Sequence, residues 1–149
     1  MDHKKLGNAA FREADYAAAI THFTAAINAL DMHAPGAATL YSNRSASYML
    51  MGEPRRAVED ARSAISAKPE WCKGHYRLAS ALEALGEKHL ALESFQMSLK
   101  LEDNAEVAER CETLQQQLRE ENNGSAGACR TNVGEFIECR CILHRCQHP

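Results

Sequence analysis

The stretch SASYMLMGEPRRAVEDARSAI, residues 45–65, decides the fold because a matching stretch, ASALEALGEKHLALESFQMSL, occupies residues 79–99. At this offset of 34 residues, small residues align with small ones and most bulky residues with bulky ones. An earlier copy aligns Gly7 with Ser45 at an offset of 38 residues, as though four residues had been added around Pro35 and Gly36. Self-similarity at such a period is typical of a protein built from structural repeats.

Each copy is predicted to form a pair of helices. Apolar residues recur at helical spacing on both sides of a break, and the breaks fall near Ala14, Gly52 and Gly86. Pro54 suits the first turn of a helix, and Pro69 is expected to end one, because the residue before a proline is pushed out of the helical region. The chain therefore reads as three helical hairpins.

The hairpins are expected to stack, because a single hairpin cannot bury its own apolar face. Phe23 and Phe95 are predicted to fill the space between helices, with small residues at the points of closest approach. A further helix follows the third copy, and one apolar stripe runs along it: Val107, Cys111, Leu114 and Leu118. Asp103 or Asn104 can cap its start. We interpret this helix as a cover for the last repeat; a coiled-coil dimer is the competing interpretation of the stripe.

A 34-residue helix-turn-helix with recurring small residues resembles the tetratricopeptide repeat family over residues 1 to about 102. The resemblance implies an all-α fold, a right-handed α-solenoid of three hairpins with a C-terminal capping helix. It predicts repeats at about 1–33, 38–71 and 72–102, a capping helix at about 103–121, and a domain covering 1–121. In that family the first helix of each hairpin lines a concave groove.

Five hydrogen-bond donors fall on these first helices: Lys4, Asn8, Asn43, Lys73 and Arg77. Lys73 and Arg77 are four residues apart, which places two like charges on one helix face at a small electrostatic cost. Stacked first helices would bring the five donors to one surface. Such a surface suits a carboxylate ligand, because hydrogen bonds from Lys and Arg to carboxylates are short and strong.

The segments KKLGN, YSNRSA and KGHYR also resemble the dicarboxylate-clamp repeats of co-chaperones of the Hop type. The resemblance carries the clamp over to the same five residues: Lys4, Asn8, Asn43, Lys73 and Arg77. It implies a non-catalytic adaptor that binds the C-terminal Glu-Glu-Val-Asp tail of heat-shock chaperones of the seventy- or ninety-kilodalton class. Lys5 is an alternative to Lys4, although only Lys4 is expected to share the face of Asn8. Asn43 has the alternative of bonding to the neighbouring backbone.

Selectivity beyond the terminal carboxylates is predicted from groove positions on the same helix faces: Phe11, Arg12, Ala46, Met49, Leu50, Ser80 and Ala84. An apolar pocket near Ala46, Met49 and Leu50 could take the valine or a residue upstream, and core packing is the alternative for Met49. Two other functions stay open at this stage. One is a general repeat scaffold that binds an internal peptide segment, and the other is a truncated assembly subunit.

Composition and charge indicate which classes of partner and activity are not expected. The chain has 149 residues, of which 45% are hydrophobic and 25% charged, and a formal net charge of −3. It contains no long basic run, so neither nucleic acid nor a membrane surface is expected as a partner. The N-terminus lacks a signal-peptide pattern, which favours a cytoplasmic, monomeric domain in a reducing setting. The seven histidines are scattered and no catalytic arrangement is recognisable, so no enzyme activity and no cofactor are expected.

The last segment differs from the rest in composition. Residues 122–149 are expected to form a disordered tail after a flexible NNGSAG linker. The tail contains five side chains of types that bind zinc or copper(I): Cys139, Cys141, His144, Cys146 and His148. Their spacing fits no standard zinc module, so no metal is assigned to them.

Overall fold

The computed structural model describes residues 2–31, 34 and 36–127, and these residues form helices without any strand. The helices are α1 (His3–Arg12), α2 (Tyr16–Asn28), α3 (Ala37–Leu50), α4 (Pro54–Ala67), α5 (Cys72–Ala84), α6 (Lys88–Leu101) and α7 (Ala105–Gly127). The predicted all-α class is confirmed. Within the described part of the chain, no helix combines the length and the hydrophobicity that crossing a membrane requires.

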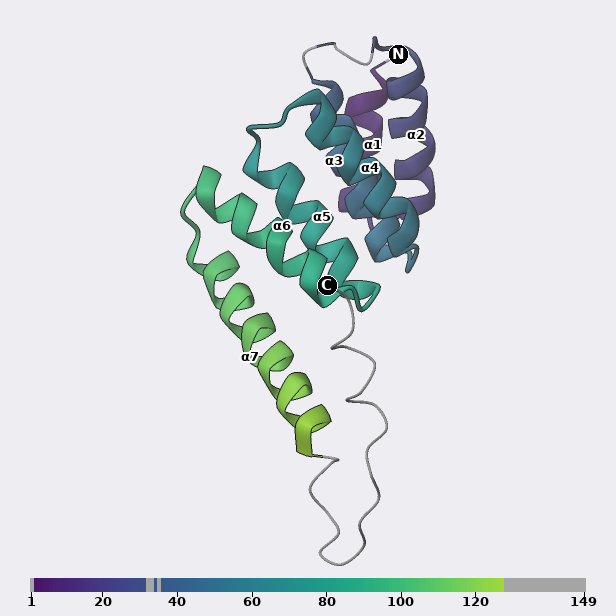
Figure 1. The fold of residues 1–149 in the computed structure, drawn as a ribbon. Coiled ribbons are helices and arrows are strands. Elements are labelled where there is room, and N and C mark those ends of the chain that lie inside the picture. The colour runs from purple at the N-terminus through teal and green to yellow at the C-terminus, as the bar shows by residue number, and fades with distance from the viewer. Residues whose placement is uncertain (1, 32–33, 35, 128–149) are drawn as a thin grey trace, which may run out of the picture. The chain divides into compact units, whose positions relative to one another are not determined.

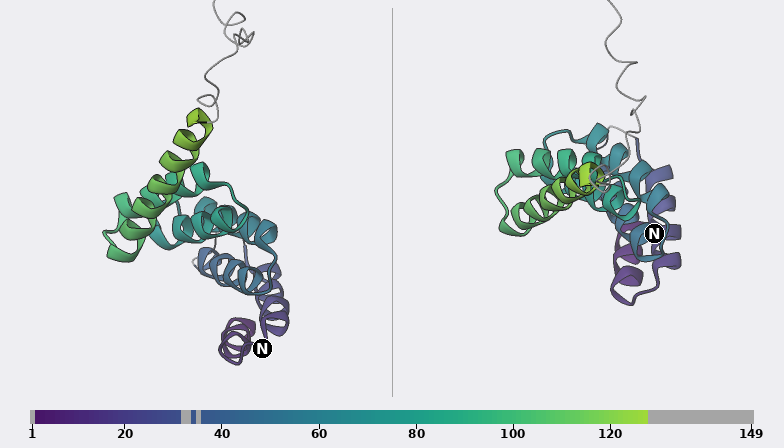
Figure 2. Two further views of the ribbon diagram at one scale, coloured as in Figure 1. Left: turned by 90° about the horizontal axis from the view of Figure 1, so that it is seen from below. Right: turned by 60° about the horizontal axis from the view of Figure 1, so that its bottom comes forward.

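The chain divides into two compact units, Met1–Leu118 and Arg119–Pro149, and the core, the polar network and the pocket described below lie in the first. Figure 1 shows α1 with α2, α3 with α4, and α5 with α6 as neighbouring pairs joined by short turns. Consecutive pairs also pack, α2 against α3 and α4 against α5. The first helices α1, α3 and α5 contact in order, and the views in Figure 2 follow this succession of hairpins.

The turns inside the three hairpins share one backbone conformation. Gly52 and Gly86 have φ angles of 78° and 80°, in the left-handed region that favours glycine. The aligned residue of the first hairpin is Ala14, with φ at 60°. A left-handed alanine costs roughly 1–2 kcal/mol, so the first turn carries strain that the other two avoid.

The core repeats along with the sequence. Phe23 and Phe95 are fully buried as predicted, and Ala61 holds the equivalent buried position in the second hairpin. Gly7 faces the ring of Phe23, and a Cβ atom at Gly7 would lie 2.6 Å from that ring. The absence of a side chain at Gly7 therefore lets α1 pack directly on the aromatic ring.

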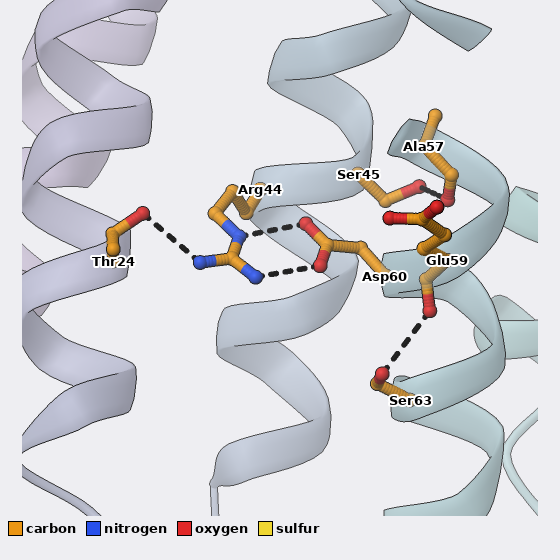
Figure 3. Close-up of polar contacts among 7 residues, drawn as sticks. All are labelled: Thr24, Arg44, Ser45, Ala57, Glu59, Asp60 and Ser63. Atoms are coloured by element: carbon orange, nitrogen blue, oxygen red, sulfur yellow. Dashed lines mark hydrogen bonds and ion pairs between the residues drawn. The ribbon is translucent and has the colours of Figure 1, made fainter. Parts of the chain in front are cut away.

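A buried polar network joins the first two hairpins (Figure 3). The guanidinium of Arg44 on α3 donates to both carboxylate oxygens of Asp60 on α4, each at 2.7 Å, and to the hydroxyl of Thr24 on α2 at 2.9 Å. Beside it, the Ser45 hydroxyl donates to the backbone oxygen of Ala57 at 2.8 Å. Because the hydrogen bond and charge of Asp60 favour the cation, the pKa of Arg44 rises above its ordinary value. The network fixes α3 between its two neighbours.

Helix α7 covers the third hairpin through the predicted stripe. The side chains of Val107, Cys111 and Leu114 are at most 5% exposed and pack in the same cluster as Phe95. The Asn104 side chain accepts hydrogen bonds from two backbone amides of the first turn, as a cap does. The stripe is buried within this chain, so no coiled-coil partner is needed to cover it. The helix continues through residue 127, past the predicted end near 121, because no proline interrupts the asparagines and glycines that suggested a linker.

Candidate functional site

A cavity of about 540 Å³ lies among the first helices of the three hairpins. Its lining residues are Lys5, Asn8, Phe11, Arg12, Phe23, Asn43, Ala46, Lys73 and Arg77. We call this cavity the cationic pocket, because four cations and two amides line it and none of its described lining residues is a carboxylate. Four of the five predicted clamp residues therefore meet here, although they are separated by up to 69 positions in the sequence.

Lys5, and not Lys4, is the lysine of α1 that lines the cationic pocket. The repeat offsets align Lys5 with Asn43 and Arg77, two residues before the small positions that begin the core of each copy. Equivalent positions on stacked hairpins face the same way, so all three side chains line the cationic pocket. The expectation that only Lys4 shares the face of Asn8 is wrong, because a residue three positions away on a helix is also a neighbour.

Lys4 lies at a different hollow. It lines a smaller cavity together with apolar residues that include Leu30, which follows α2, and Leu40 of α3. Its repeat equivalents are Ser42, which is fully buried, and Tyr76, which faces α7. The assignment of Lys4 to the clamp stays a prediction.

The two asparagines contact each other. The side-chain amide of Asn43 donates to Asn8 Oδ1 at 3.1 Å and so links α3 to α1. This bond uses an acceptor of Asn8 and leaves the two N–H groups of its amide as donors. The backbone oxygen of Asn43 accepts a separate hydrogen bond from the Ser47 hydroxyl. The pair is therefore held in place with donor groups at the cationic pocket.

Arg77 and Lys73 form the opposite side of the pocket and are electrostatically strained. The Nε atom of Arg77 is buried without a hydrogen-bond partner among the described residues. Burial lowers the pKa of the Arg77 guanidinium. Burial also lowers the pKa of the Lys73 ammonium, and the nearby charge of Arg77 lowers it further. A bound carboxylate would relieve both groups, since it supplies the acceptor and the negative charge that they lack.

The predicted groove positions separate into two groups. Phe11, Arg12 and Ala46 line the cationic pocket. Met49 packs against the buried cluster that the second and third hairpins share with α7, which agrees with its core alternative, and Leu50 is 55% exposed. The proposed apolar pocket around Ala46 therefore does not form from these three side chains together.

The other two groove positions, Ser80 and Ala84, also lie away from the pocket lining. Ala84 is exposed, and the Ser80 hydroxyl accepts a hydrogen bond of 3.4 Å from Arg110 on α7. Arg110 also donates to the Tyr76 hydroxyl at 3.2 Å and pairs with Glu83. Sequence reasoning missed this cluster, because Arg110 lies outside the apolar stripe by which the helix was predicted.

The described residues provide no cluster of metal ligands. They include no group of three or more metal-ligating His, Cys, Asp or Glu side chains. The thiols of Cys72 and Cys111 are both free, and the hydrogen bond of Cys72 to Glu102, 2.7 Å long, raises the pKa of that thiol. The five Cys and His residues of the tail lie outside the described residues. The fold and the pocket together define a helical-repeat domain with a cationic pocket.

Comparison with known proteins gives the family. Residues 1–79 match the family model described as "Serine/threonine-protein kinase BSK1-like, TPR repeats". The chain belongs to this family of tetratricopeptide repeats. It is 42% identical over 101 residues to a protein of Dictyostelium discoideum named "Protein STIP1 homolog", an alignment that covers 68% of this chain and 17% of that protein.

Two solved structures are similar in fold and were determined with peptides bound. One is the structure of the first TPR domain of Spaghetti (RPAP3) bound to the HSP90 peptide SRMEEVD. Its sequence identity to this chain is 25% and the TM-score is 0.73, with coverage of 78% of this chain and 90% of that one. The second is the second TPR domain of human RPAP3 in complex with the HSP70 peptide SGPTIEEVD, with 28% identity, a TM-score of 0.69, and coverage of 76% and 92%. Both peptides end in the same four residues.

Proposed function

We propose that this domain is a non-catalytic adaptor that binds the acidic C-terminal tail of a heat-shock chaperone, ending Glu-Glu-Val-Asp, in the cationic pocket. The observation that carries the proposal is the composition of the pocket, in which four cations and two amides converge without a carboxylate among the described lining residues. A C-terminal aspartate offers two carboxylates close together, which such a cluster complements. The proposal places the domain in the cytoplasm and assigns it no catalytic step.

The two peptide complexes of similar fold support this choice of ligand, since both hold a peptide that ends in EEVD. Affinity is expected around the micromolar range, because a short flexible peptide loses conformational freedom on binding. Affinity should also fall as salt is added, because the pocket side chains are partly exposed and their charges are screened.

A titration with paired peptides tests the proposal. Fluorescein-labelled SGPTIEEVD with a free C-terminal carboxylate is compared with the same peptide as its C-terminal amide, by fluorescence anisotropy. The acid form is expected to bind at least about tenfold more tightly, since one charge-assisted hydrogen bond is worth about 1.5–3 kcal/mol. Equal binding of both forms would favour a scaffold that takes an internal segment and would refute the clamp.

Variants of the first helix then decide which lysine serves the pocket. Lys5→Ala is expected to weaken binding of the acid peptide more than Lys4→Ala, because Lys5 lines the cationic pocket and Lys4 lines a separate hollow. Both lysines are exposed, so neither variant should alter folding. A larger loss for Lys4→Ala would restore the assignment that the family resemblance implies.

A further inference from the structure

Arg12 is a cation of the pocket that the clamp resemblance does not assign. It lies one helical turn beyond Asn8 on α1, and both side chains line the cationic pocket. The Arg12 side chain is exposed and makes no ion pair or hydrogen bond with any described residue. Its charge is therefore available to a ligand in the pocket.

The scaffold does not require a cation at this position. Arg12 occupies the last turn of α1, where a positive charge interacts favourably with the helix dipole. The repeat offsets align Arg12 with Leu50 and Ala84, however, and the last turns of α3 and α5 contain no basic residue. The other two hairpins thus form without this charge, so the hairpin fold does not require Arg12 at the pocket.

The spacing of Arg12 from Asn8 matches the repeat of an extended peptide. Four residues of α-helix advance about 6 Å, and two residues of extended chain advance about 6.6 Å. Alternate side chains of an extended chain point the same way. A peptide whose terminal residue lies at Asn8 and whose chain runs along α1 therefore presents the side chain two residues before its end to Arg12.

We propose that Arg12 determines specificity by binding a carboxylate side chain two residues before the C-terminus of the ligand. The inference rests on the proposed function and narrows its ligand class to tails that end in an acidic residue, any residue, and a second acidic residue. The residue between the two acids points away from α1, so its chemistry is not read by Arg12.

A double-mutant cycle between protein and peptide tests this subsite. The protein is the full chain, as wild type, Arg12→Gln and Arg12→Lys. The parent peptide is SGPTIEEVD. In SGPTIEQVD, glutamine replaces the nearer glutamate, which lies two residues before the terminus. In SGPTIQEVD, glutamine replaces the farther glutamate, which lies three residues before it. Arg62→Gln, an exposed arginine of α4 outside the pocket lining, is the matched control.

Loss of the nearer glutamate is expected to weaken binding to wild type at least about fivefold more than binding to Arg12→Gln, since the two charges lie close only in the wild-type complex. Loss of the farther glutamate should affect both proteins alike. Arg12→Lys should keep part of the coupling, because it retains the charge without the bidentate geometry. Arg62→Gln should show the wild-type pattern.

Absence of coupling at the nearer glutamate, or coupling at the farther one instead, would overturn the inference. Either result leaves the proposed function intact if the acid peptide still binds more tightly than its amide. Equal binding of acid and amide would refute the proposed function itself, so the two failures are distinguishable. Circular dichroism of each variant establishes that the helical fold is retained, and Arg12→Lys preserves the charge at the end of α1 if Arg12→Gln does not fold.

Discussion

Replacing Arg77 by methionine should weaken ligand binding and yet leave the free domain at least as stable as the wild type. The substitution removes a buried N–H group that has no partner among the described residues, and an unsatisfied group of this kind costs about 1–3 kcal/mol. It also removes repulsion from Lys73 four residues away, worth about 0.2–0.5 kcal/mol. Against this, it loses the contact of the guanidinium with the Tyr76 ring at 5.9 Å, worth about 0.5–1 kcal/mol.

These contributions leave a net gain of about 1 kcal/mol in the free energy of unfolding of the unliganded domain. Binding should change in the opposite direction. Loss of a charge-assisted hydrogen bond of about 1.5–3 kcal/mol corresponds to a rise in Kd of about 10- to 150-fold. Arg77 would then be a residue whose burial is unfavourable in the free domain and is offset only when a carboxylate binds.

Urea unfolding followed by circular dichroism measures the first quantity, and fluorescence anisotropy with the labelled acid peptide measures the second. Arg62→Met is the matched control, because Arg62 is exposed on α4 and lies outside the pocket lining. The control should leave the affinity unchanged. The reasoning is refuted if Arg77→Met lowers the free energy of unfolding by more than about 1 kcal/mol, or if its affinity stays within about threefold of wild type.

Three further predictions concern the scaffold and the pH dependence. Asp60→Ala should lower the free energy of unfolding by about 3–5 kcal/mol in urea titrations, because it leaves the Arg44 charge buried without its partner. A loss below about 1 kcal/mol would instead mean that water solvates Arg44. Ala14→Gly should raise the melting temperature, since glycine removes roughly 1 kcal/mol of left-handed strain, and a lower melting temperature would contradict the strain. Peptide affinity should fall as the pH rises through the lowered pKa of Lys73, because the free side chain loses its proton at a lower pH than an ordinary lysine. Lys73→Arg should reduce this loss of affinity at alkaline pH. An unchanged pH profile of the variant would exclude Lys73 as the source of the loss.

The repeat period of the sequence predicts most of the fold. The offsets that align Gly52 with Gly86 and Phe23 with Phe95 predict both the turns and the buried ring positions, and the structure confirms them. Local chemistry accounts for this success, since left-handed turns, helix spacing and aromatic packing are expressed in residues close together in the sequence. The end of α7 was predicted less well, because weakly unfavourable helix residues do not stop a helix that no proline interrupts.

The candidate site divides in the same way. Sequence alone identified five donors on the first helices, Lys4, Asn8, Asn43, Lys73 and Arg77, because helix periodicity and repeat phase fix which face each side chain occupies. Tertiary structure placed the last four around one pocket together with Lys5, while Lys4 lines a separate hollow, since the stacking of hairpins decides which face of each helix meets its neighbours. It also decided the burial of Arg77, which has no signature in the sequence, because desolvation depends on atoms supplied by helices far apart in the chain.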